Sequence, residues 1–326
     1  MKKQSKQQRQ VLEAIMLYGP VRSSELVKLL KISTKTIYKH LSALLAQQEI
    51  KKIGATPKVF YMVNESLEDE AVVLDKVDQF VEQNYIYVSP TGEMTRGVAG
   101  FQLWCLKNKF DFEKEKKVFA TRMQAMEKLK KNGVISAKKT ILSGKGELFL
   151  NNIFFSEFYN LDYFGKTKLG QMVYLGKSSQ NREIILEIAK LIKPAVRSLI
   201  ERYEIGLICF VPPTVERKVQ FLEVLQMGLK LKLPQVLALK VASLTKVPQK
   251  TLRKLEDRII NAQTTIAVDP SQKINSNVLI IDDATGSGAT LNEIAKKIRK
   301  IASKEVKIIG YSVVGSFKGF DVISEV

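Results

Sequence analysis

The fold of this chain is decided by the stretch Val278-Leu279-Ile280-Ile281-Asp282-Asp283-Ala284-Thr285-Gly286-Ser287-Gly288-Ala289-Thr290. Its first four residues are all apolar, which is typical of a strand buried on both faces of a parallel sheet. The residues after the acids are small and hydroxylated and include glycine, and a helical pattern follows at Leu291–Ile301. A turn of this kind can bind a phosphate through backbone N–H groups at the helix N-terminus.

The two adjacent acids fall at the carboxyl end of the predicted strand, the edge at which open α/β sheets bind ligands. Carboxylates there suit the 2- and 3-hydroxyls of a ribose, or a hydrated Mg²⁺ ion. A Walker A loop is excluded because no lysine lies between Gly286 and Thr290, and a dinucleotide fingerprint because Leu291 stands where its third glycine belongs. A plain buried turn is the remaining alternative, and it does not explain adjacent aspartates at a strand end.

Apolar strands alternate with helices around this stretch, which predicts a parallel sheet covered on both faces. We expect strands at 206–211, 236–240, 264–268, 277–281 and 306–314, and helices at 181–203, 219–231 and 291–301. Shorter β-like runs precede them at 134–135, 147–155 and 171–175.

The quoted stretch resembles the phosphoribosyl-pyrophosphate (PRPP) signature of type I phosphoribosyltransferases, which has four apolar residues, two acids and then a hydroxyl-rich Gly-Ala-Thr. The chain from about 180 to 326 also resembles their competence-associated F-type subgroup. The features that carry this second resemblance are Val211-Pro212-Pro213-Thr214 after the first strand, Pro248-Gln249-Lys250, and Arg258-Ile259-Ile260-Asn261. Gly286 stands where a threonine is more usual in the phosphate loop.

The resemblance implies a role for each matching position. Asp282 and Asp283 are expected to hold the ribose hydroxyls and, through water, a Mg²⁺ ion that accompanies PRPP. The 5-phosphate is assigned to Thr285, Gly286, Ser287, Gly288, Ala289 and Thr290. The pyrophosphate is assigned to Pro212, Pro213 and Thr214, with Arg217 nearby. Residues 246–258 are expected to form a mobile flap whose cations close over the leaving group, namely Lys250, Arg253, Lys254 or Arg258.

No base-recognising hood can be identified from the pattern, so residues 134–180 are its expected source and 181–326 the expected core of a domain spanning 134–326. Aromatic side chains in the hood segment can either stack on a base or fill the core, and we favour the core. They are Phe149, Phe154, Phe155, Phe158, Tyr159, Tyr163, Phe164 and Tyr174.

The N-terminal segment 1–64 is strongly basic, with twelve Lys or Arg residues opposed by Glu13, Glu25 and Glu49. Helices are expected at 6–18, 24–30 (capped by Ser23) and 34–47 (capped by Ser33). Two short strands around Gly54-Ala55-Thr56-Pro57 complete the pattern as a hairpin. This order resembles a winged helix-turn-helix, and the basic charge favours a nucleic-acid partner over a module used only for protein contacts.

A winged helix-turn-helix places its third helix in the DNA major groove. The residues expected to face double-stranded DNA from that helix are Thr34, Lys35, Thr36, Tyr38, Lys39 and His40, and those flanking the wing are Lys51, Lys52 and Lys58. Lysines there can neutralise phosphates or reach guanine edges.

Residues 65–133 are predicted to be a mostly helical linker that serves as a dimer interface, with helices at 68–83 and 112–131 and a loop at Ser89-Pro90-Thr91-Gly92. Trp104 is expected in the core. Homodimerisation is expected because operator readers bind paired half-sites.

Composition supports a protein of the cytoplasm with a polyanionic partner. The 326 residues carry a formal net charge of +19, and no apolar run is long enough to cross a bilayer. Cys105 and Cys209 are the two cysteines and His40 the one histidine, which argues against a disulfide framework or a structural zinc site.

Two functions fit these features. One is a DNA-binding transcriptional regulator that senses PRPP or a nucleotide through its phosphoribosyltransferase-like domain. The other is an active phosphoribosyltransferase, in nucleotide salvage or nucleic-acid processing, with the winged helix as a tether. A protein used only for interactions is a third alternative, and fold alone does not choose among the three.

Overall fold

The structure is a computed structural model that describes residues 5–18, 21–53, 59–64, 76–137, 147–241 and 264–316. Internal contacts divide the chain into two units, Met1–Thr121 and Arg122–Val326. This division differs from the predicted boundaries after residues 64 and 133. Lys58 of the predicted wing and the predicted flap cations Lys250, Arg253, Lys254 and Arg258 lie outside the described residues.

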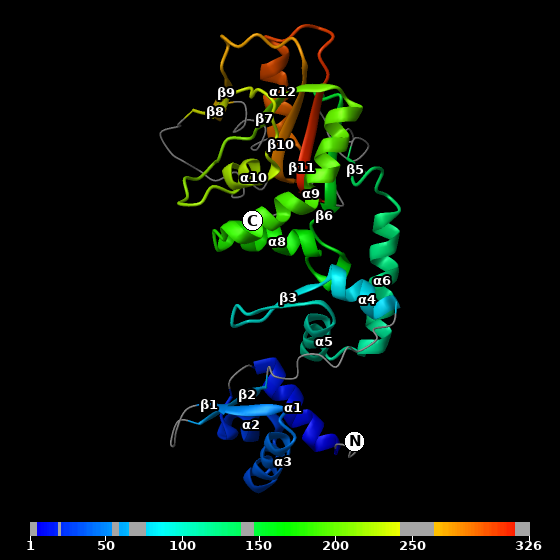
Figure 1. The fold of residues 1–326 in the computed structure, drawn as a ribbon, viewed down its shortest axis with the longest axis vertical. Helices are drawn as coiled ribbons and strands as arrows, with labels where there is room; N and C mark the ends of the chain where they lie inside the picture. The colour runs from blue at the N-terminus through cyan, green and yellow to red at the C-terminus, as the bar shows by residue number, and fades with distance from the viewer. Residues whose placement is uncertain are drawn as a thin grey trace. The chain divides into compact units, whose positions relative to one another are not determined.

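The first unit begins with three helices and a hairpin (Figure 1). These are α1 (Lys6–Tyr18), α2 (Ser23–Leu30), α3 (Thr34–Ala46), β1 (Ile50–Ile53) and β2 (Phe60–Val63). The two strands are antiparallel, and Val21 before α2 pairs with Tyr61. The predicted inner face of α3 is buried at Ile37, Leu41 and Leu44, and Ser33 caps this helix by accepting the Thr36 N–H. The helix order and the Ser33 cap are confirmed, whereas α2 is capped one residue early, at Arg22.

The remainder of the first unit holds α4 (Lys76–Asn84), β3 (Ile86–Val88), β4 (Met94–Arg96), α5 (Gly97–Asn108) and most of α6 (Phe112–Glu127). The sequence predicted the loop at 89–92 but not the antiparallel β3–β4 hairpin that it closes. Trp104 packs in an aromatic cluster with Tyr85 and Phe101, which confirms its place in the core.

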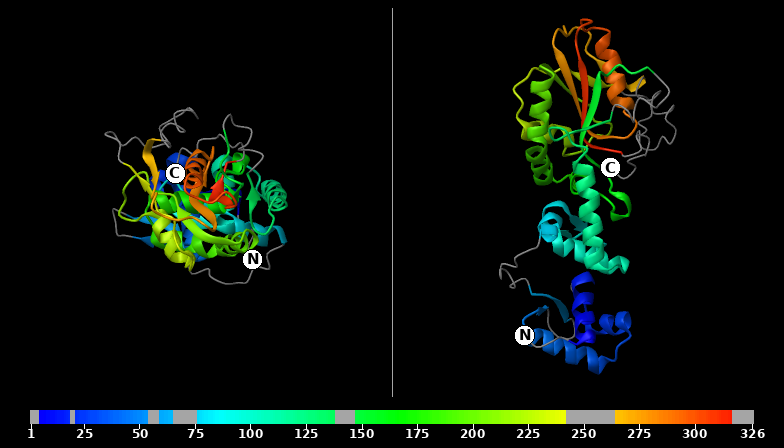
Figure 2. Two further views of the ribbon diagram at one scale, coloured as in Figure 1. Left: turned by 90° about the horizontal axis from the view of Figure 1, so that it is seen from above. Right: turned by 90° about the vertical axis from the view of Figure 1, so that its right-hand side faces the viewer.

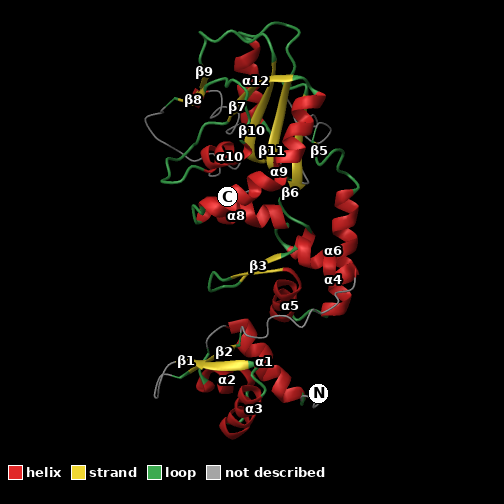
Figure 3. Ribbon diagram, viewed as in Figure 1, coloured by secondary structure: helices red, strands yellow, loops and turns green. Residues whose placement is uncertain are grey.

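The second unit is a mixed α/β structure around a five-stranded, mostly parallel sheet (Figure 3). The strand order is β5 (Ile135–Ser136), β6 (Asn152–Phe158), β11 (Ile308–Gly315), β10 (Asn277–Thr285) and β7 (Ile205–Phe210). All neighbours are parallel except β5 and β6. The apolar run Val278–Ile281 is fully buried in β10, as the continuous apolar pattern predicted.

Helices cover both faces of this sheet (Figure 2, right). On one face lie α8 (Lys168–Ser178), α9 (Arg182–Arg202) and α10 (Phe221–Leu229), and the ring of Phe154 on β6 packs against Tyr203 at the end of α9. On the other face lies α12 (Ala289–Arg299), whose Leu291 packs over Gly310 of β11. A short 3-10 helix, η1 (Asp162–Phe164), precedes α8.

Two expectations for residues 134–180 are corrected. The run 171–175 lies inside α8 and is not a strand, because Thr167 caps this helix and Gly170 packs tightly against the Tyr159 carbonyl. The second correction concerns the boundary between hood and core at 180. Strands β5 and β6 belong to the same sheet as β10, so this boundary does not separate two structures. Five of the eight aromatic side chains are buried, which fits their expected place in the core: Phe154, Phe155, Phe158, Tyr159 and Phe164.

A two-stranded antiparallel ribbon flanks the predicted flap. Its strands are β8 (Ala238–Lys240) and β9 (Ile266–Val268), and they lie on either side of residues 242–263. Within the described residues, no helix is both long and apolar enough to span a membrane.

Candidate functional site

The predicted strand, turn and helix are present at 277–299. Strand β10 continues to Thr285, so both acids lie within its last four residues and not beyond its end. Three residues, Gly286 to Gly288, then connect to α12, and Gly288 is the N-cap with a left-handed φ of 75°. A side chain at this φ is strained, whereas glycine adopts it readily. The first N–H groups of α12 therefore emerge directly beside the carboxyl end of β10.

Thr285 places a buried hydroxyl at the base of this turn. The residue is 4% exposed, and its Oγ1 has no hydrogen-bond partner among the described residues. A buried polar group without a partner costs about 1–3 kcal/mol, so such groups are rare unless something else satisfies them. Thr285 therefore leaves a buried hydroxyl without a described hydrogen-bond partner next to a helix N-terminus.

The acids Asp282 and Asp283 point to opposite faces of β10, because successive side chains of a strand alternate. Asp282 Oδ1 accepts the backbone N–H of Asp283 at 2.8 Å. Burial, and then the charge of Asp283, raise the pKa of Asp282 to about 8, while the positive charge of Lys177 acts in the opposite direction.

Asp283 is held in an ion pair with a helix of the second unit. Its Oδ2 lies 2.9 Å from Nζ of Lys177 on α8, and the two side chains are only 17% and 18% exposed. Asp283 shares its strand face with Thr285, two residues further along. The carboxylate that we expected to bind a ribose hydroxyl therefore already has a cationic partner in this structure.

The acids do not fit a Mg²⁺ ion shared between them. Their side chains diverge across the strand, and Lys177 is in contact with one of them. Within the described residues, no three His, Cys, Asp or Glu side chains gather as metal ligands.

The loop after β7 lies at the same edge of the sheet, since β7 and β10 are parallel neighbours. Of the residues assigned there, Thr214 accepts a hydrogen bond from Nζ of Lys240 at 3.0 Å. Lys240 is partly buried, and this burial lowers its pKa. Arg217 donates to the backbone carbonyl of Lys177, so it holds the end of α8 instead of projecting freely along the edge.

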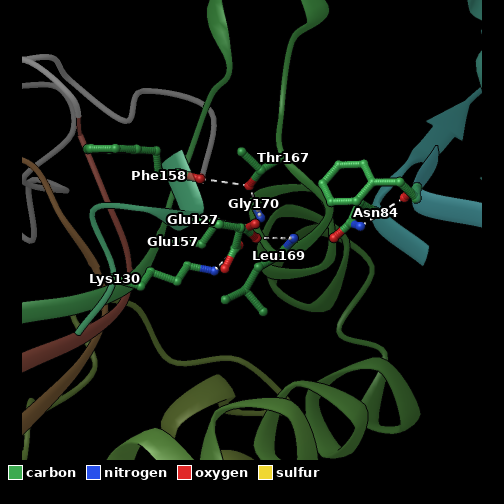
Figure 4. Close-up of polar contacts among 9 residues, drawn as sticks. Asn84, Glu127, Lys130, Glu157, Phe158, Thr167, Leu169 and Gly170 are labelled. Carbon is green, nitrogen blue, oxygen red and sulfur yellow. Dashed lines mark hydrogen bonds and ion pairs between the residues drawn. The ribbon is translucent and has the colours of Figure 1, made fainter. Parts of the chain in front are cut away.

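The start of α8 is anchored by a buried carboxyl on β6 (Figure 4). Glu157 accepts the N–H of Leu169 at 3.0 Å in the first turn of α8, beside Thr167, which donates to the Phe158 carbonyl at 2.6 Å. Burial raises the pKa of Glu157. The carboxyl of Glu157 and the ion pair of Lys177 thus hold α8 at both ends.

The predicted DNA-facing residues of α3 divide into two groups. Thr34, Lys35, Tyr38 and Lys39 are exposed, while Thr36 is partly buried against Ser33. Tyr38 also exchanges a hydrogen bond with Ser23 of α2. On the hairpin, Lys52 is exposed and Lys51 partly buried.

The prediction that His40 faces outward is wrong. The side chain is 8% exposed, and its Nε2 has no partner among the described residues. Burial, and then the charge of Lys39, lower its pKa. His40 lies with Ile37 and Leu41 on the buried side of α3. The residue type alone did not indicate this, since histidine occurs on both the buried and the exposed faces of helices.

Sequence reasoning missed Lys177, Glu157 and Lys240. Each acts through a contact with a segment far away along the chain, and none stands in a recognisable motif. The one available signal was the position of Lys240 at the end of a predicted strand that leads toward the expected flap.

No model of a known protein family matches the chain, and no curated protein matches its sequence. Among solved structures, the chain is similar to adenine phosphoribosyltransferase from Leishmania tarentolae. That match has 14% sequence identity and a TM-score of 0.26, and it covers 48% of this chain and 91% of the other. A likeness at this level does not indicate a function.

Proposed function

We propose that the second unit binds a 5-phosphorylated ribose, as PRPP or a nucleotide, at the turn between β10 and α12. The observation that carries this proposal is the buried, unpartnered hydroxyl of Thr285 beside the N-terminus of α12. A phosphate oxygen seated there accepts hydrogen bonds from this hydroxyl and from first-turn N–H groups, with no lysine in the turn itself. Residues 285–290 are the proposed phosphate contacts.

The acids beside the turn are the proposed ribose contacts. A 5-phosphate fixed by the turn leaves the sugar ring lying along the end of β10, where carboxylate oxygens accept hydrogen bonds from hydroxyl groups. Asp283 shares the strand face of Thr285, so it is the better placed of the two. Pro212, Pro213 and Thr214 border the same edge, beside the proposed phosphate-binding turn.

We further propose that the first unit binds double-stranded DNA through a winged helix-turn-helix and that the chain is a ligand-sensing transcriptional regulator. Three helices followed by a hairpin, and the exposed Lys35 and Lys39 on α3, support this. Residues 65–133 are the proposed dimer interface. For the ligand to regulate DNA binding, it must bind one conformation of the protein better than another.

Two titrations on the full chain test the regulator. Calorimetric binding of ribose 5-phosphate but not of ribose is expected, since the phosphate provides the main contacts. Anisotropy with labelled duplex DNA is expected to give salt-dependent binding that PRPP shifts. Absence of ribose 5-phosphate binding removes the sensor, and absence of binding to any duplex at moderate salt removes the regulator.

An active phosphoribosyltransferase is the second candidate, and Lys240 favours it. This lysine is partly buried and bonds to the Thr214 hydroxyl at the ligand edge, where a cation can stabilise the charge of a departing pyrophosphate. Release of pyrophosphate from PRPP, measured across a panel of bases, decides between the candidates. Turnover with any base establishes an enzyme. If no base releases pyrophosphate, the proposal of a ligand sensor remains.

A further inference from the structure

The ion pair between Lys177 and Asp283 places a positively charged side chain next to one of the two acids. Nζ of Lys177 lies 2.9 Å from Oδ2 of Asp283, and both side chains are largely withdrawn from solvent. Neither residue belongs to the turn that contacts the phosphate. A cation this close to a carboxylate in a partly buried site is screened far less than a surface pair.

The position of Lys177 is fixed by the fold around it. Its helix, α8, begins at the buried carboxyl of Glu157, and at its other end the Lys177 carbonyl accepts a hydrogen bond from Arg217. Gln180, just beyond the helix, accepts the backbone N–H of Val219 at 3.1 Å. These contacts hold the end of α8 against the segment after β7. The ammonium group of Lys177 therefore lies next to β10 before any ligand binds.

A phosphorylated sugar that approaches this edge carries negative charge toward two carboxyl groups. An ionised Asp283 without a partner would repel it, and a bound divalent cation is one way to remove that repulsion. The geometry instead supplies a lysine on one acid, and the other acid points to the opposite face of the strand. One carboxylate oxygen of Asp283, Oδ2, contacts Lys177, and a carboxylate has a second oxygen that can accept a hydrogen bond from a ribose hydroxyl.

We propose that Lys177 is a tethered counter-ion of the ribose-binding carboxylate Asp283, which lets the site bind a 5-phosphorylated ribose without a divalent metal ion. Lys177 is thus a positioning residue that acts through Asp283. This inference rests on the proposed function of the same site.

Calorimetric titration of ribose 5-phosphate into the full chain, in EDTA and again in excess Mg²⁺, tests the idea. The wild-type dissociation constants in the two conditions are expected to agree within about twofold. Lys177→Met is expected to weaken binding in EDTA by about tenfold, equivalent to about 1.4 kcal/mol, and Mg²⁺ is expected to restore most of that loss. Lys177→Arg, which keeps the charge, is expected to bind in EDTA nearly as well as wild type.

Lys190→Met is the matched control, because Lys190 is an exposed residue of α9 and its replacement changes the net charge equally. It is expected to bind like wild type in both buffers. A purely structural ion pair would lower the melting temperature of Lys177→Met without making its binding depend on Mg²⁺.

The outcomes separate this inference from the proposed function. Wild-type binding that requires Mg²⁺, or metal-free binding unchanged in a folded Lys177→Met, overturns the role of Lys177 and leaves the ribose phosphate site standing. No binding by wild type in either buffer overturns both. The wild-type comparison needs no variant, so a wild-type requirement for Mg²⁺ overturns the role of Lys177 even if Lys177→Met fails to fold.

Discussion

The two proposed anion-binding regions of this protein differ in how they present positive charge. Helix α3 offers exposed lysine side chains at Lys35 and Lys39, on long flexible stems. The turn before α12 offers a buried hydroxyl and backbone N–H groups, and Lys177 near the end of the same strand is paired with Asp283. The first arrangement suits a long polyanion of repeating charge, and the second suits one phosphate in one orientation. Composition reveals the first kind of site, but only the local order of residues reveals the second.

The largest effect is expected from removing the exposed lysines of α3, which tests whether this helix binds DNA. Replacing both Lys35 and Lys39 with alanine removes two exposed cations, and duplex DNA affinity is expected to fall about 30-fold, or about 2 kcal/mol. Anisotropy titration measures the loss, and ribose 5-phosphate binding should not change. The double variant Lys190→Ala with Lys304→Ala loses the same charge from exposed positions of the second unit and should bind DNA normally. Equal losses in the two double variants would mean that overall charge, and not α3, binds DNA.

The next largest effect is expected from removing the Thr285 hydroxyl, which tests whether the turn before α12 binds a phosphate. Thr285→Val keeps the shape of the side chain and removes the orphaned hydroxyl, so ribose 5-phosphate affinity is expected to fall about tenfold, or about 1.4 kcal/mol. The free protein should melt no lower than wild type, because the hydroxyl has no described partner to lose. Thr121→Val makes the same chemical change at an exposed site on α6 and serves as the control. Lower stability with unchanged affinity would show that the hydroxyl serves the fold and not a ligand.

A smaller effect concerns the pH response of the acid pair. The pKa of Asp282 is about 8 when folded against an ordinary value of 3.8, so the folded state holds the extra proton between these limits. Stability therefore declines as pH rises from about 4 to about 8, and Asp282→Asn escapes this decline. Calorimetry should give a larger gain in Tm for Asp282→Asn at pH 9 than at pH 5, because the linkage grows by about 1.4 kcal/mol per pH unit within this window. Equal gains at both pH values would contradict the raised pKa.

The smallest expected effect is the pH dependence of the stability of α3, which depends on His40. The pKa of buried His40 is lowered, so the unfolded state binds its proton more readily, and α3 is expected to lose stability as pH falls below about 6.5. Hydrogen exchange of peptides covering Thr34–Ala46 measures this loss, which should stay below about 1 kcal/mol. His40→Gln, compared with wild type at each pH, should remove the acid-induced increase in exchange. An identical pH response in the two proteins would exclude His40 as the cause.

Sequence patterns predicted the features that depend on neighbours in the chain. The three N-terminal helices follow from apolar spacing, the start of α3 from Ser33, and the β10–turn–α12 unit from Val278–Thr290. Each of these is decided within about a dozen residues. Periodicity therefore carried the information that was needed.

The features that sequence reasoning missed depend on contacts between distant segments. Residues 171–175 look strand-like by composition, but Thr167 and the close packing of Gly170 begin a helix there. Strand β6 joins the sheet beside β11, which is the last described strand of the chain. Lys177 meets Asp283 only because α8 lies across the face of that sheet, and no spacing rule along the chain can indicate such a meeting.

Helix α8 also links the proposed ligand edge to a distant strand mechanically. Its 11 residues span about 16 Å, and an α-helix of that length resists compression along its axis. Glu157 holds one end and the Lys177–Asp283 pair holds the other. A shift at the end of β6 would therefore be expected to move Lys177 relative to Asp283, because one short helix joins the two contacts.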